Sequence, residues 1–202
     1  MSILFRLIPV QLGILLFVGK KQNKSFTFRG VLGNTEKSPT KQYFLFIPIY
    51  ILFALIFFLV LAPSVNEFFV EKLFWWYPQE YNFQESMQDP ASMKDYKGFQ
   101  VIFVLYILLS CIIAPIVEEL YFRGYLLPRM DEKMGKWAPY INTILFSIYH
   151  FFSPWENLIR IIALTPLVYL VWRKKNIRFG IFSHVILNCI GAVAMAVMVY
   201  AV

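Results

Sequence analysis

The strongest constraint on this chain is a series of long apolar stretches, because each one has to be removed from water. They fall at residues 2–18, 43–62, 98–119, 139–153, 157–172 and 179–202. A helix of roughly 20 mostly apolar residues crosses a bilayer core. The chain is 59% hydrophobic and only 15% charged, so its polar surface is too small to cover a water-soluble domain. We therefore predict an all-α, polytopic transmembrane helix bundle with about six membrane segments.

Lysine and arginine are concentrated in alternate connections between these stretches. Six lie within residues 20–41, four within residues 123–136 and four within residues 173–178. The long connection over residues 64–97 carries only three. The positive-inside rule places the rich side in the cytoplasm. Both termini then lie on the opposite side, unless the first segment only dips into the membrane and leaves the N-terminus cytoplasmic. This asymmetry accounts for the net charge of +7, so we expect no nucleic-acid binding.

The stretches and the long connection predict one integral membrane domain with two parts. Residues 1–97 would form N-terminal membrane segments and an interfacial loop, and residues 98–202 a helix core. The loop holds Trp75, Trp76 and Tyr81, and aromatic side chains of this kind are typical of the headgroup region. The compact chain favours a bacterial plasma (inner) membrane, with the lipid bilayer as a constant partner.

Several ionisable side chains fall inside apolar stretches, where each costs about 2.5–3.5 kcal/mol on insertion. Glu118, Glu119 and Arg123 are close together in the third stretch. The i,i+4 spacing lets Glu119 pair with Arg123 on one helix face. Glu118 lies about 100° further round and lacks this partner. We predict that Glu119 is structural and that Glu118 is available as a general base.

Both histidines of the chain also lie in apolar stretches. Phe146 and His150 would share one helix face, and His184 and Asn188 another. A single histidine on an apolar helix typically makes only a helix-to-helix hydrogen bond. Two histidines, a glutamate pair and an asparagine on three helices indicate a shared functional site. The groups can meet only if the fourth helix enters the bilayer late, near residues 139–142.

The three motifs together resemble those of the CPBP family of intramembrane proteases. They are Glu-Glu-x-x-x-Arg at residues 118–123, Phe-x-x-x-His at residues 146–150 and His-x-x-x-Asn at residues 184–188. The family includes type II CAAX prenyl endopeptidases and bacterial Abi proteins linked to bacteriocin processing and self-immunity. The resemblance implies that residues 98–202 form a catalytic helix core of this type. Seven or eight segments are common in the family, against about six here.

The resemblance also implies a role for each matched position. Glu118 and His150 would hold and activate the attacking water, while His184 and Asn188 would stabilise the tetrahedral oxyanion. The remaining matched residues would support the site, and they are Glu119, Arg123 and Phe146.

We therefore expect an intramembrane endopeptidase that hydrolyses a membrane-associated peptide or lipidated protein near the cytoplasmic face, using glutamate-activated water and no cofactor. A zinc site formed by Glu118, His150 and His184 stays open as an alternative, although the chain has no His-Glu-x-x-His helix. A non-catalytic membrane scaffold or bacteriocin self-immunity protein is the alternative from another class. A serine hydrolase and a proton-relay transporter are disfavoured, because neither a Gly-x-Ser-x-Gly motif nor a repeat of broken helices is present.

Overall fold

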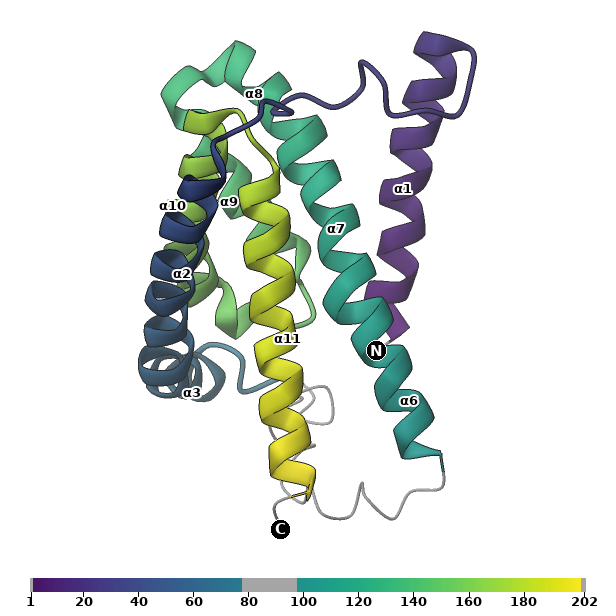
Figure 1. Ribbon diagram of the computed structural model, residues 1–202. Coiled ribbons are helices and arrows are strands. Elements are labelled where there is room, and N and C mark those ends of the chain that lie inside the picture. The colour runs from purple at the N-terminus through teal and green to yellow at the C-terminus, as the bar shows by residue number, and fades with distance from the viewer. Residues whose placement is uncertain (1, 78–97, 201–202) are drawn as a thin grey trace.

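The computed structural model describes residues 2–77 and 98–200, and within these ranges the chain is almost entirely helical (Figure 1). The α-helices are α1 (Ser2–Asn23), α2 (Thr40–Ile56), α3 (Ala62–Lys72), α6 (Phe99–Tyr106), α7 (Ala114–Glu119), α8 (Leu127–Met134), α9 (Ala138–Tyr149), α10 (Asn157–Lys174) and α11 (Arg178–Tyr200). The only β pairing in the described ranges is an isolated bridge between Thr35 and Asn176. The prediction of an all-α membrane bundle is confirmed.

Three π-helical segments join consecutive α-helices without a break. They are η1 (Phe57–Leu61) between α2 and α3, η3 (Ile107–Ile113) between α6 and α7, and η4 (Leu120–Leu126) between α7 and α8. Each ends just before a residue followed by proline, namely Pro63, Pro115 and Pro128. Proline has no N–H to donate, so it leaves a carbonyl of the preceding turn without its helical partner. Short π segments of this kind are frequent at functional sites.

Four helical stretches are long and apolar enough to cross a membrane, against the six segments expected. They are Thr40–Lys72, Phe99–Tyr149, Pro154–Lys174 and Arg178–Tyr200. The third expected segment and most of the fourth correspond to Phe99–Tyr149, along which the chain turns back at α8 (Figure 1). The first expected segment corresponds to α1, which is not among the four. A helical membrane bundle therefore fits the chain, while the number of six crossings is not confirmed.

The expected interfacial loop is partly helical. Its first residues, from position 64, continue the second membrane helix to the end of α3 at Lys72. Trp75 and Trp76 follow and are largely exposed. Tyr77 packs instead against the buried Trp155 of the 3-10 turn η6 (Pro154–Glu156). Tyr81 lies outside the described residues.

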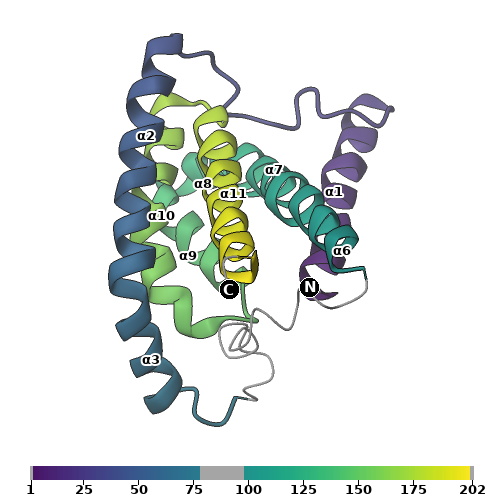
Figure 2. The same cartoon turned by 60° about the horizontal axis from the view of Figure 1, so that its bottom comes forward.

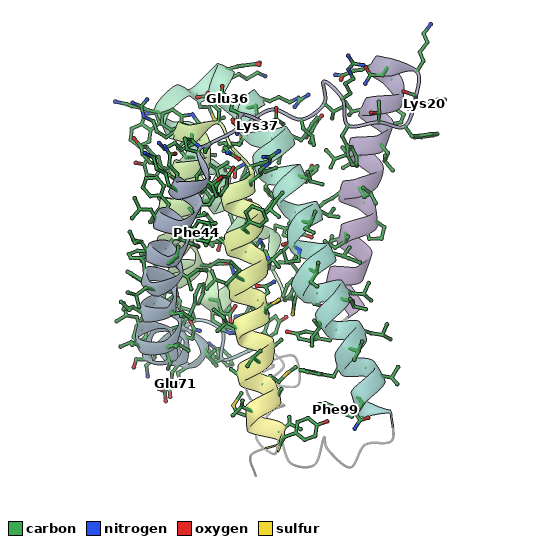
Figure 3. The ribbon with its side chains drawn as sticks, in the orientation of Figure 1. Lys20, Glu36, Lys37, Phe44, Glu71 and Phe99 are labelled. Atoms are coloured by element: carbon green, nitrogen blue, oxygen red, sulfur yellow. The ribbon has the colours of Figure 1, made fainter. Side chains whose placement is uncertain are left out.

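The three basic connections lie at one end of the bundle, as their spacing predicts (Figure 1). They are the connecting loop (residues 24–39), α8 with the 3-10 turn η5 (Gly135–Trp137), and the turn between α10 and α11. Figure 3 places Lys20 and Lys37 at this basic end and Glu71 at the other. The assignment of the basic end to the cytoplasm stays a prediction.

Helix α11 occupies a central position in the bundle. It contacts α2 and α10 on one side and η3 and α7 on the other, while α9 packs against α10 (Figures 1 and 2). Helix α1 packs on the outer side of α7 and η4. Large apolar side chains such as Phe44 and Leu59 are exposed on the outer surface, which is expected where the solvent is lipid.

The connecting loop is tied to the helices that it crosses. The backbone N–H of Gly33 donates to the carbonyl of Gly124 at 2.7 Å, and the side-chain amide of Asn34 donates to the carbonyl of Arg123 at 2.9 Å. These carbonyls precede Pro128 by four and five residues, the two positions that a backbone N–H at residue 128 would reach in an α or a π register, and Pro128 has no N–H to offer. The loop therefore fixes the end of η4, one turn beyond the two glutamates.

Candidate active site

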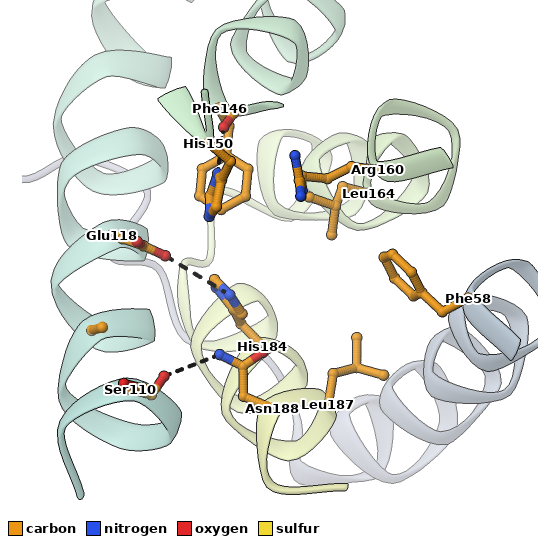
Figure 4. Close-up of a pocket in the computed structure, with 11 residues that line it drawn as sticks. Phe58, Ser110, Glu118, Phe146, His150, Arg160, Leu164, His184, Leu187 and Asn188 are labelled. Atoms are coloured by element: carbon orange, nitrogen blue, oxygen red, sulfur yellow. Dashed lines mark hydrogen bonds and ion pairs between the residues drawn. The ribbon is translucent and has the colours of Figure 1, made fainter. Parts of the chain in front are cut away.

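A cavity of about 170 Å³ lies between α7, α9, α10, α11 and the π segments η1 and η3 (Figure 4). One side, here named the polar wall, carries the four predicted catalytic residues, which are Glu118, His150, His184 and Asn188. The other side, the apolar wall, is formed by Phe58, Leu164 and Leu187. The structure thus brings together, in the polar wall alone, residues that are up to 70 positions apart along the sequence.

Glu118 projects from α7 into the cavity and is only 2% exposed. Its Oε2 lies 3.9 Å from Nε2 of His184. Its Oε1 is buried and has no hydrogen-bond partner among the described residues. A buried acceptor without a partner is costly unless a water or a ligand fills the position. Oε2 of Glu119 is also buried without a hydrogen-bond partner, but only Glu118 lines the cavity, so Glu118 is the member of the glutamate pair that is available for chemistry.

Glu119 has the opposite environment, because its carboxylate is surrounded by protein. Its Oε1 lies 3.2 Å from the guanidinium of Arg123, as the i,i+4 spacing predicts, and both side chains are 1% exposed. The same oxygen accepts a hydrogen bond from Nδ1 of His184 at 3.2 Å. Its Oε2 lies against Gly180 of α11, where a Cβ atom would come within 2.2 Å. The glycine therefore lets α11 approach the carboxylate.

Phe146 holds the three motifs together by aromatic contact. Its ring centroid lies 4.1 Å from the guanidinium carbon of Arg123, 4.7 Å from the ring of His150 and 5.8 Å from the ring of His184. The side chain is 2% exposed. Phe146 thus combines core packing with a position beside the site.

His150 is not inside its helix but caps it. The fourth apolar stretch runs to residue 153, whereas α9 ends at Tyr149, because the backbone leaves the helical region at His150 with φ −85° and ψ 46°. The imidazole Nδ1 lies 2.8 Å from the carbonyl of Phe146, which the end of the helix leaves free. Since a carbonyl only accepts, Nδ1 carries the proton and Nε2 keeps its lone pair.

The tautomer of His184, which lies on α11, is fixed in the same way by an acceptor at Nδ1. Its Nδ1 donates to Glu119, so the proton of the neutral ring is on Nδ1 and Nε2 faces Glu118. Nε2 becomes a donor only when the ring is protonated. Asn188, one turn further along α11, donates from Nδ2 to the carbonyl of Ser110 at 3.2 Å. The amide nitrogen has a second N–H besides the one in this bond.

The cavity also involves residues that the motifs do not contain. Arg160 lines it, and its guanidinium pairs with Glu156 and donates to Ser153 Oγ at 2.8 Å. The i,i+4 spacing lets Arg160 pair with Glu156 on one helix face, whereas the burial of Arg160 depends on tertiary packing. The Tyr149 hydroxyl faces the Glu118 carboxylate without completing a regular hydrogen bond. Nothing in the sequence around Phe58 predicts its place in the apolar wall.

The zinc alternative involves Glu118, His150 and His184, which share the cavity. Within residues 2–77 and 98–200, no three His, Cys, Asp or Glu side chains are grouped closely enough to hold a metal ion. A catalytic zinc site needs three protein ligands, and zinc binding by these residues stays an alternative. Cys111 and Cys189 are free thiols.

Comparison with known proteins gives one match, which covers the part of the chain that carries all three motifs. Residues 100–190 match the family described as Type II CAAX prenyl endopeptidase Rce1-like. No curated protein and no solved structure matches this chain. The matched residues include η3, α7, α9, α10 and the polar wall from Glu118 to Asn188. Residues 100–190, a little under half of the chain, are therefore similar to the CPBP/CAAX family of intramembrane proteases.

Proposed function

We propose that this protein is an intramembrane endopeptidase in which Glu118 activates the water that attacks the peptide bond. The observation that carries the proposal is the polar wall, where a buried carboxylate with one unpartnered oxygen, two imidazoles and a primary amide from three helices face one cavity. The family match supports the same class of reaction.

The water would be held between Glu118 and His150. Oε1 of Glu118 is an acceptor without a protein partner, and Nε2 of His150 is an acceptor because Nδ1 is the protonated nitrogen. A water that donates to both presents its oxygen lone pair to the substrate carbonyl carbon. Glu118 takes the proton as the bond forms and passes it to the departing amine, as general acid–base catalysis requires.

The oxyanion would be stabilised by His184 and Asn188. Protonated His184 offers an N–H at Nε2, and Glu119 holds the ring in place through Nδ1. Asn188 offers the N–H that is not bonded to Ser110. Two donors fixed in advance toward the developing negative charge are the arrangement that lowers the barrier most in acyl transfer.

The apolar wall suggests the kind of substrate. Phe58, Leu164 and Leu187 face the polar wall across the cavity and offer no charge or hydrogen bond to a ligand side chain. An apolar side chain next to the scissile bond fits this wall, as expected for a membrane-associated peptide or lipidated protein. We propose that the substrate reaches the cavity near the basic, cytoplasmic end.

The test compares purified wild type with Glu118→Gln in nanodiscs, on a panel of membrane-associated peptides with free and lipidated ends. Glu132→Gln is the matched control, since Glu132 is exposed on α8 away from the cavity. Wild type and Glu132→Gln should cleave the same peptide at similar rates, and Glu118→Gln should not. Equal cleavage by Glu118→Gln would reject the glutamate mechanism. Inactivation by a chelator that zinc reverses would favour the zinc alternative instead.

The non-catalytic scaffold or self-immunity role makes a different prediction. A folded wild type would cleave nothing in the panel, and Glu118→Gln would retain the cellular phenotype that deletion of the chain removes. Both results together would replace the endopeptidase proposal.

A further inference from the structure

The carbonyl that Asn188 contacts is left free by the local helix register. In η3 the N–H of Ala114 donates to the carbonyl of Leu109, five residues back. If this pattern of bonds to the fifth residue back continued, the carbonyl of Ser110 would accept a hydrogen bond from the backbone N–H of residue 115. This residue is Pro115, which has none. The carbonyl of Ser110 is therefore left without a donor from its own helix.

Asn188 supplies the missing donor from α11. Its Nδ2 lies 3.2 Å from the carbonyl of Ser110, in a partly buried position. Within a bilayer an unsatisfied carbonyl costs several kcal/mol, because water is not available to fill it. The carbonyl accepts and cannot donate, so it also fixes which end of the amide faces η3. The nitrogen points to Ser110, and its second N–H is left for another acceptor.

The same device occurs a second time, where no catalytic residue is involved. In η4 the N–H of Leu127 donates to the carbonyl of Phe122, again five residues back. The following residue is Pro128, so the carbonyl of Arg123 lacks its donor. Asn34 of the connecting loop fills this position at 2.9 Å. A proline after a π segment thus creates a specific acceptor for an asparagine from another element.

We propose that Pro115 is a positioning residue for the endopeptidase reaction. By leaving the carbonyl of Ser110 free, it anchors one N–H of Asn188 and directs the other toward the position of the oxyanion. With any other residue at position 115, a backbone N–H would compete for this carbonyl and release the amide. The inference rests on the proposed function for its catalytic consequence, whereas the anchoring itself is a property of the folded chain.

The kinetic test is a double-mutant cycle with Pro115→Ala and Asn188→Ala. Removal of an oxyanion donor lowers kcat by about 10²–10³-fold, and we expect Pro115→Ala to lower kcat by roughly tenfold with KM unchanged. In the Asn188→Ala background, Pro115→Ala should cause no further loss, since residues that act through one interaction are not additive. Independent, multiplicative losses would overturn the proposal. Pro48→Ala is the matched control, because Pro48 lies exposed within α2.

A second measurement is independent of catalysis. In protein with ¹⁵N-labelled asparagine, the side-chain amide signal of Asn188 is identified by its absence in Asn188→Ala. Its hydrogen exchange with solvent should be slow in wild type and Pro48→Ala, and at least tenfold faster in Pro115→Ala. Unchanged exchange would overturn the anchoring. If wild type cleaves no peptide while exchange responds as expected, the proposed function fails and the anchoring stands. Pro115→Gly also restores the N–H and replaces Pro115→Ala if the latter does not fold.

Discussion

The two walls of the cavity are built in different ways. On the polar wall, side chains are fixed by directional contacts, such as the bond from His184 to Glu119 and the bond from His150 to the carbonyl of Phe146. On the apolar wall, Phe58 and Leu187 make no such bonds and are placed only by the helices that carry them. Because the two walls are built independently, substitutions should be able to change the catalytic step and the selection of substrate separately. Changes in the polar wall should lower kcat, and changes in the apolar wall should raise KM.

The largest effect is expected from Glu118→Gln. The amide keeps the shape of the side chain but cannot take a proton from water, and general base catalysis is worth about 10²–10⁴-fold. We expect kcat/KM to fall by about 10³-fold, with the unfolding temperature unchanged within roughly 2 °C, which corresponds to about 0.5–1 kcal/mol. Progress curves and thermal unfolding in the same detergent check both statements. A tenfold loss or less would mean that another group activates the water.

Gly180→Ala should damage the polar wall through its support. The added Cβ would lie 2.2 Å from Oε2 of Glu119, and overpacking of this kind costs about 1–3 kcal/mol. We expect a lower unfolding temperature together with a loss of kcat. Gly191→Ala is the matched control on the same helix, because its added Cβ would have nothing within 4 Å. Equal stability of the two variants would show that α11 can move away from Glu119 at little cost.

Phe58→Ala tests the apolar wall. Loss of apolar contact with a substrate side chain is worth about 1–3 kcal/mol, so KM should rise by roughly tenfold while kcat changes less than about twofold. The control is Leu59→Ala, since the neighbouring Leu59 is 70% exposed on the outside of the bundle. Steady-state kinetics on the peptide that wild type cleaves best give both constants. A fall in kcat at constant KM would contradict the division between the two walls.

The smallest effect is expected from Glu156→Gln. Glu156 pairs with Arg160 at the edge of the cavity, but its side chain is 34% exposed, and ion pairs in contact with solvent are worth about 1 kcal/mol or less. The bonds from Arg160 to Ser153 and Asn157 remain. We expect a shift of the unfolding temperature of only a few degrees and little change in activity. A large loss of activity would give Arg160 a direct part in the reaction.

The sequence predicts which polar side chains meet better than it predicts the number of membrane crossings. The pairing of Glu119 with Arg123 follows from helix geometry alone, so the spacing is sufficient to predict it. The convergence of Glu118, His150 and His184 follows from the cost of placing ionisable groups in lipid. By contrast, the length of an apolar stretch does not show whether the helix ends with it. Phe99–Tyr149 is one continuous helical stretch, although two separate membrane segments were expected there.

Other features depend on tertiary contacts that no local pattern contains. Phe58 reaches the cavity because η1 and α10 are in contact. The bond between Asn188 and Ser110 depends on a π register in one helix and an amide in another. Pro115 is present in the sequence, but the sequence alone supports two roles equally: a proline that kinks its helix and a proline that a membrane helix tolerates. Its effect on a particular carbonyl becomes clear only once the register of η3 is known.

The connecting loop limits how freely the family-matched segment could be transplanted. Residues 100–190 contain the carbonyls of Arg123 and Gly124, yet the donors that satisfy them, Asn34 and Gly33, belong to the unmatched part of the chain. A graft of the matched segment onto a different N-terminal region would inherit two buried acceptors with no donors. Residues 100–190 carry the motifs, but a segment that can be exchanged between proteins must also include the connecting loop.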